Sequence, residues 1–135
     1  MLNLGMFAGV DSPKEARTAV LNCGLPPSTN TQDLALMVSE VVTNAVRHGT
    51  GPGGELMLRV EMLRNTVHVE LEEIGISGWP PGLPGSPRRP AEAAAKKPPI
   101  GGWGLQLVQD LSDRWGVHEK PNRSVWFDLK LVPVG

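Results

Sequence analysis

The sequence predicts one α+β domain, a two-layer sandwich in which helices cover one face of a mostly antiparallel, mixed sheet. Three patterns lead to this prediction: helical apolar spacing in the first fifty residues, strict alternation from Leu56 to Leu71, and glycines before a further helical pattern. The length of 135 residues suits a single domain covering 1–135 and leaves too few residues for two cores.

Composition excludes several classes of protein. Hydrophobic residues make up 40% of the chain and charged residues 20%, as in soluble globular proteins. The net charge of −1 argues against direct nucleic-acid binding, and no apolar run approaches the roughly 20 residues that span a membrane. The N-terminus lacks signal-peptide features, and the single Cys23 cannot form an internal disulfide, so we expect a cytoplasmic protein.

Two helices are expected in the first half. Ser12–Leu21 begins with Pro13 in its first turn, which suits a helix N-terminus, and Gly24 ends it. The central helix starts at Asn30 or Thr31 and stops at Gly49. Its inward stripe consists of apolar residues spaced four, three and four apart: Leu34, Val38, Val41 and Ala45.

A polar line runs along the border of that stripe. Glu40, Asn44 and His48 lie four residues apart, so they align along the central helix at the edge of the core. Side chains held there are partly desolvated and fixed in direction, as a functional site requires. The alternative is a solvated helix flank with a modest side-chain pair.

A hairpin follows the central helix. Residues 56–62 and 67–71 alternate between apolar and polar, with a turn at Arg64–Asn65. The same alternation places Glu73 on the buried face of the second strand. A carboxylate there needs a protein donor or a ligand as its partner.

The composition changes between Ile74 and Pro99, which is rich in proline and glycine. Such a long loop inside a small domain is typically a lid, a binding loop or a linker, and two cores do not fit around a linker. The glycines at 101, 102 and 104 then lead into a helix with inward residues Leu105, Val108, Leu111 and Trp115, which Gly116 caps. Such glycines are also common in plain turns. Strands are expected from Val117 and over Ser124–Val132.

The segments SEVVTNAVRHG, GGWGLQLVQDLSDRWGV and SVWFDL resemble the Bergerat-fold (GHKL) ATP-binding domain of histidine kinases and DNA gyrase. They are most similar to the stand-alone anti-sigma-factor serine/threonine kinases of actinobacteria. The similarity covers about Ala16 to Leu131.

The resemblance implies a role for each matching residue. Glu40 would polarise an attacking water or a substrate hydroxyl, and Asn44 would coordinate the Mg²⁺ bound to ATP. Arg47 and His48 would lie near the phosphates, and the segment at about 75–100 would be the ATP lid. The remaining nucleotide-binding positions would be Gly75 and Glu73 of the first glycine box, Gly102, Gly104 and Leu105 of the second, and Ser124, which supports the adenine pocket.

One position departs from the family pattern. The family has an aspartate that accepts a hydrogen bond from the adenine amino group, and here Glu73 takes that place. The additional methylene moves the carboxylate by about 1.5 Å. Either the pocket shifts to accept Glu73 or adenine recognition is weakened, at a loss of about 1.5–3 kcal/mol.

The resemblance favours a kinase that binds Mg-ATP, phosphorylates a serine on an antagonist protein and sequesters a sigma factor. The alternative is a regulator-binding module with weakened or lost ATP binding, and a free-standing ATPase ranks lowest. Relatives of this type commonly dimerise, but the sequence identifies no face for a homodimer. The expected lid contains four basic residues that would either contact the γ-phosphate or be solvated: Arg88, Arg89, Lys96 and Lys97. Two tryptophans at its ends, Trp79 and Trp103, would either bind a partner or pack the lid.

Overall fold

The computed structural model describes residues 1–50, 53–75, 105–119 and 122–131. The elements along the chain are β1 (Leu2–Phe7), α1 (Ser12–Leu21), α2 (Thr31–His48), β2 (Glu55–Leu63), β3 (Thr66–Gly75), α4 (Gln106–Leu111), β4 (Arg114–His118) and β5 (Ser124–Lys130).

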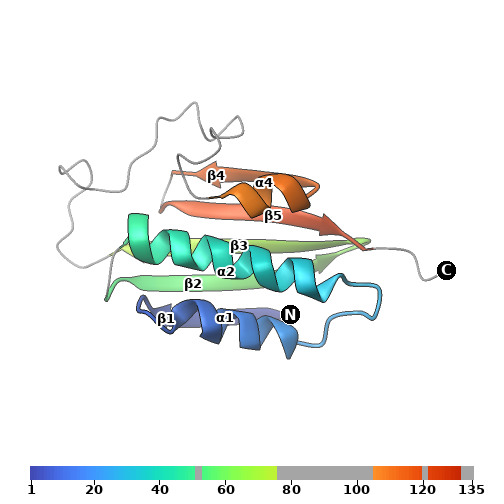
Figure 1. Ribbon diagram of the computed structural model, residues 1–135, viewed down its shortest axis with the longest axis horizontal. Helices are drawn as coiled ribbons and strands as arrows, with labels where there is room; N and C mark the ends of the chain where they lie inside the picture. Colours follow the sequence, from blue (N-terminus) through green and yellow to red (C-terminus); the bar gives the residue numbers. More distant parts are fainter. Residues whose placement is uncertain (51–52, 76–104, 120–121, 132–135) are drawn as a thin grey trace.

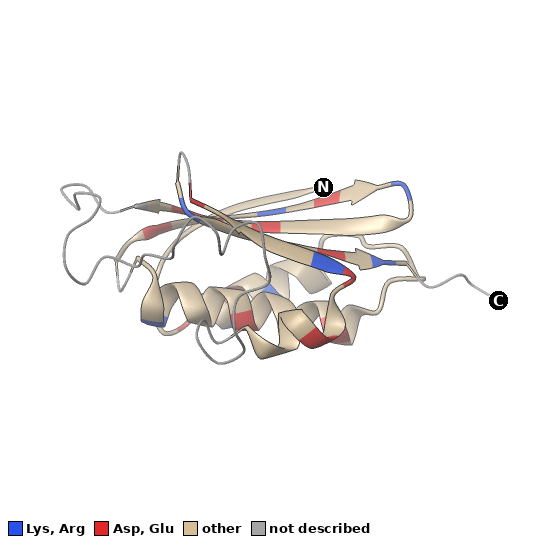
Figure 2. Ribbon diagram, turned by 90° about the horizontal axis from the view of Figure 1, so that it is seen from above, with Lys and Arg blue, Asp and Glu red and all other residues tan. Residues whose placement is uncertain are grey.

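The five strands form one sheet in the order β1-β2-β3-β5-β4. The three helices of the described residues lie against one face of this sheet, and no described helix covers the other face (Figures 1 and 2). This arrangement confirms the predicted two-layer α+β fold. Every pairing between described strands is antiparallel, so the sheet has no mixed character in this part of the chain. Within the same residues, no helix is both long and apolar enough to span a membrane.

The central helix α2 has the predicted bounds because its ends are capped. The side-chain oxygen of Asn30 accepts a hydrogen bond from the backbone N–H of Asp33 at 3.2 Å. At the other end, the N–H of Gly49 donates to the carbonyl of Ala45 at 2.9 Å. The four apolar residues of the predicted stripe are all buried.

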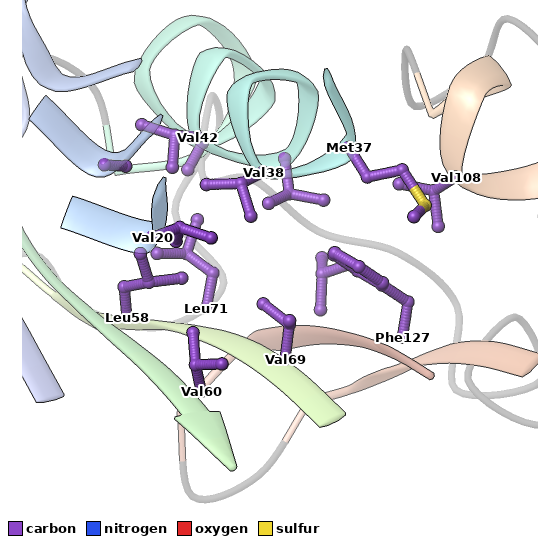
Figure 3. Close-up of a cluster of buried hydrophobic side chains, with 14 of the residues drawn as sticks. Val20, Met37, Val38, Val42, Leu58, Val60, Val69, Leu71, Val108 and Phe127 are labelled. Carbon is purple, nitrogen blue, oxygen red and sulfur yellow. The ribbon is translucent and has the colours of Figure 1, made fainter. Parts of the chain in front are cut away.

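The core lies between the helices and the sheet, as Figure 3 shows. Helix residues meet strand residues there, and both groups are fully buried: Val20, Met37, Val38, Val42 and Val108 from the helices, and Leu58, Val60, Val69, Leu71 and Phe127 from the strands. Each such side chain contributes about 1.5–3 kcal/mol on burial. This packing fixes the rotation of α2, and therefore decides which of its residues face away from the core.

The N-terminal strand β1 is an element that the predicted order of helices and strands lacks. Leu2, Leu4 and Met6 alternate with polar or small residues, and Leu4 pairs with Leu58 of β2. This period-two signal is present in the sequence, but it extends over only six residues.

The predicted helix from Leu105 through Trp115 is too long. α4 ends at Leu111, because Ser112 takes an extended conformation and the N–H of Asp113 donates to the Asp128 carbonyl of β5 at 2.9 Å. Trp115 and Gly116 therefore belong to strand β4, and Gly116 is not a helix cap. The spacing misleads because Trp115 also faces the core from a strand, where it pairs with Phe127.

The face of the sheet without helices carries a buried acid, Asp128 on β5. Its carboxylate lies 2.5 Å from Nδ1 of His68 and accepts hydrogen bonds from Nε and Nη2 of Arg114 at 3.2 and 3.0 Å. The Trp126 ring stacks with the rings of His68 and His118, at centroid distances of 5.7 and 6.3 Å. These contacts join β3, β5 and β4 on the side away from the helices.

Candidate functional site

A pocket of about 340 Å³ lies between α2 and α4. This volume falls within the range of small-molecule sites, about 300–1,000 Å³. Seven residues of α2 and one of α4 line it: Leu36, Ser39, Glu40, Thr43, Asn44, Arg47, His48 and Leu107. The structure thus brings together the four α2 residues that the sequence singles out. Ser39 and Thr43 were not predicted; they lie four residues apart, on a strip of α2 beside that of Glu40 and Asn44.

Asn44 is the most unusual residue of this pocket. Its side chain is only 4% exposed, yet neither its Oδ1 nor its Nδ2 has a hydrogen-bond partner in the described part of the chain. Leaving a buried polar group unsatisfied costs about 1–3 kcal/mol. A carboxamide kept at that cost in the wall of a pocket is well suited to binding a ligand, with one acceptor and two donor hydrogens available.

Glu40 reaches across the pocket to α4. Its Oε2 accepts a hydrogen bond from the backbone N–H of Leu107 at 3.1 Å, and its Oε1 accepts one from Val108 at 3.0 Å. These N–H groups belong to the first helical turn, where they lack acceptors within the helix. The sequence gives no sign of this contact, because the partners lie 67 and 68 positions after Glu40.

Arg47 and His48 occupy the last turn of α2, and both are exposed at the pocket. Basic residues there interact favourably with the helix dipole. The pocket therefore has a carboxylate and an unpartnered carboxamide along one helix, with an arginine at its end. Oxygen ligands and a cationic group in this order suit a divalent cation together with a polyanion.

Glu73 lies outside this lining, in a buried cluster at the end of α2. Its carboxylate is 3.6 Å from Nη1 of Arg123, and a backbone hydrogen bond comes from Thr50. Burial raises the pKa of Glu73 to about 7; Arg123 and the Thr50 hydrogen bond counteract this, and the charge of Glu119 adds to it. The partner that a buried Glu73 requires is therefore supplied, at least in part, by the protein.

Gly49 makes room for this cluster. A Cβ atom at position 49 would lie 2.5 Å from Oε1 of Glu73 and 2.6 Å from the carbonyl oxygen of Ala45. Only glycine fits there without movement of its neighbours. Sequence reasoning identified Gly49 as a helix stop but missed Arg123 and Thr50, since a lone arginine and a lone threonine carry no recognisable spacing.

The other predicted site residues fall into two groups. Gly75 ends β3, Ser124 begins β5 and is 3% exposed, and Leu105 is the buried N-cap residue of α4. None of these three lines the pocket between α2 and α4. The second group lies outside the described residues: Gly102, Gly104, Trp79, Trp103, Arg88, Arg89, Lys96, Lys97 and the rest of the expected lid.

Comparison with known proteins identifies the family to which the chain belongs. No curated protein matches the chain. The sequence pattern of one family, described as the histidine kinase-like ATPase domain, matches residues 13–127. That range includes nearly all of α1, the whole of α2, the β2–β3 hairpin and α4, and nearly all of the β4–β5 hairpin. The chain therefore belongs to the histidine kinase-like ATPase domain family, and the two-layer sandwich described above is its Bergerat fold.

Proposed function

We propose that this protein is a Mg-ATP-dependent serine/threonine kinase of the anti-sigma type, which phosphorylates an antagonist protein and sequesters a sigma factor. Family membership implies ATP binding. The observation that most supports a working nucleotide site is the buried, unpartnered carboxamide of Asn44 beside Glu40 in a pocket of suitable size. The proposal of these protein partners rests on the resemblance to small anti-sigma kinases.

The residues of the pocket fit Mg-ATP at its phosphate end. Asn44 would provide Oδ1 as a hard oxygen ligand for Mg²⁺. This oxygen is available because it accepts no hydrogen bond from the described part of the chain. Arg47 and His48 would face the phosphate charge from the end of α2. Bound Mg-ATP would supply the transferable phosphoryl group and neutralise its charge. Glu40 would accept the proton of the substrate hydroxyl, a contribution of typically about 10²–10⁴-fold in rate.

The base end of the site fits less well. The Glu73 carboxylate already interacts with Arg123 and Thr50, and it does not line the described pocket. Adenine would have to share this carboxylate with these partners, and at 6% exposure little of it is open to a base. This observation favours the second candidate, a regulator-binding module of the same family whose nucleotide affinity is weakened.

Calorimetric titration of Mg-ATP into the purified protein tests the proposal. We expect binding in the micromolar range for the wild type, with a loss of at least tenfold in Asn44→Ala because a metal ligand is removed. The matched control is Asn3→Ala, since Asn3 is an exposed residue of β1. Absence of binding up to millimolar Mg-ATP in the wild type would contradict the kinase proposal and leave the regulator-binding module. Equal affinity in the two variants would contradict the role of Asn44.

A further inference from the structure

The contact between Glu40 and α4 has the geometry of a helix cap supplied by another helix. The two carboxylate oxygens bind two consecutive backbone N–H groups, those of Leu107 and Val108, at 3.1 and 3.0 Å. Leu105, the N-cap residue of α4, makes no side-chain capping bond of its own. Glu40 therefore does for α4 what an Asp or Ser at the N-cap does in most helices.

α4 depends on such support because it is short. It contains six residues, and isolated helices shorter than about 12 residues are marginal in water. Its apolar attachment consists of the N-cap residue Leu105 at 4% exposure, Val108 at 0%, and the partly buried Leu111. Val108 packs into the same core cluster as Met37 of α2 (Figure 3). Core packing and the Glu40 contact thus hold α4 against α2 together.

The same contact fixes the direction of the carboxylate. Each oxygen of an ionised carboxylate has two lone-pair sites, and each hydrogen bond to α4 uses one of them. The sites that remain can accept a hydrogen bond from a group in the pocket, which Glu40 also lines. Without α4, the side chain would regain its rotamer freedom and would no longer be aimed at one point.

We infer that Glu40 and the first turn of α4 hold each other in place, so that the proposed catalytic carboxylate is correctly oriented only while α4 is docked on α2. In this arrangement the backbone N–H groups of Leu107 and Val108 act as positioning groups, which touch the acid and not the substrate. The catalytic part of the inference rests on the proposed kinase function. The mutual dependence of Glu40 and α4 does not, and it can be measured without nucleotide.

The test perturbs the contact from both sides in the full-length protein. Val108→Ala weakens the docking of α4 without altering Glu40, and its matched control is Val67→Ala, a fully buried valine on β3. Glu40→Gln removes the carboxylate, and its control is Glu61→Gln on an exposed position of β2. Two quantities are recorded by NMR: hydrogen-exchange protection of the amides at positions 107 and 108, and the side-chain carboxyl ¹³C shift of Glu40.

We expect Val108→Ala and Glu40→Gln each to lower protection at both amides by about ten- to a hundredfold relative to their controls, the range for losing a charge-assisted hydrogen bond. Val108→Ala should also move the Glu40 carboxyl shift toward that of an exposed glutamate such as Glu61. If Glu40→Gln leaves both amides as protected as in Glu61→Gln, Glu40 does not hold α4. If Val108→Ala and Val67→Ala give the same Glu40 carboxyl shift, α4 does not orient the acid.

These outcomes are separable from those of the proposed function. If the wild type does not bind Mg-ATP, the kinase proposal is contradicted, but the NMR result still reports the mutual dependence of Glu40 and α4. Conversely, normal Mg-ATP binding with unprotected amides at positions 107 and 108 in the wild type would overturn the inference alone.

Discussion

The buried carboxyl of Glu73 predicts an unusual pH dependence of stability. Burial raises its pKa from 4.5 to about 7 in the folded protein. The folded state therefore holds this proton more tightly than the unfolded state does, so the carboxyl favours folding most at low pH. Its contribution declines as the pH rises from about 4.5 to about 7 and then stays constant.

The size of the effect follows from the two pKa values. At 1.36 kcal/mol per unit, the difference between 4.5 and about 7 corresponds to a decline of about 3 kcal/mol in the free energy of unfolding. Arg123 limits the decline because it stabilises the ionised form, and Glu119 increases it because its charge repels Glu73. A decline of this size is a large fraction of the stability of a small domain.

Urea denaturation at pH 4.5 to 8 measures this contribution when the wild type is compared with Glu73→Gln. Glutamine does not titrate, so the difference in unfolding free energy between the two proteins isolates Glu73 from all other ionisable groups. We expect this difference to change by about 3 kcal/mol across the range, with the wild type losing stability relative to the variant as pH rises. Glu61→Gln, the same substitution at an exposed position, is the matched control. A constant difference for Glu73→Gln would refute the reasoning.

Three further changes test the packing of the fold, each by the free energy of unfolding in urea. Gly49→Ala should lower the free energy of unfolding by about 1–3 kcal/mol, because its Cβ would lie 2.5 Å from Glu73 Oε1 and 2.6 Å from a backbone carbonyl oxygen. An unchanged urea midpoint would show that these neighbours move freely. Asp128→Ala should cost about 1–3 kcal/mol, because its buried carboxylate joins three strands; a loss below 0.5 kcal/mol, as at an ordinary surface site, would contradict this. Phe127→Ala should lower the free energy of unfolding by about 3–5 kcal/mol, because Phe127 is fully buried. Phe7→Ala, at a residue 72% exposed, should lower it by less than about 0.5 kcal/mol. Equal losses in the two variants would contradict the burial of Phe127.

Local patterns predicted those parts of the fold whose contacts lie close together in sequence. The bounds of α2 follow from Asn30 and Gly49, and the β2–β3 hairpin follows from its alternation and from Arg64, which takes φ of 57° in the turn. The end of α4 was mispredicted because a partner far along the chain decides it: Asp113 bonds to Asp128 of β5. Four-residue spacing alone could not distinguish a long helix from a short helix followed by a strand.

The candidate site divides in the same way. Helical spacing alone placed Glu40, Asn44 and His48 on one face, and the structure shows all three at one pocket. The partners of Glu40 and Glu73 could not be predicted, since backbone N–H groups are present at almost every residue and only the fold selects those of Leu107, Val108 and Thr50. A sequence identifies side-chain chemistry, but it does not identify the backbone groups that orient it.

The distribution of satisfied and unsatisfied polar groups separates the two ends of the candidate nucleotide site. At one end, Asn44 keeps both amide atoms without a partner among the described residues, and this costs stability unless a ligand binds. At the other end, the carboxylate of Glu73 is 6% exposed and interacts with Arg123 and Thr50, so a base that binds there must reach a buried group and share it with them. The free energy gained on nucleotide binding should therefore come mostly from the phosphates and their metal ion, with little from the base. We therefore expect the site to discriminate between nucleotides by the number of phosphates more strongly than by the identity of the base, because the carboxylate expected to contact the base is buried and shared with Arg123 and Thr50.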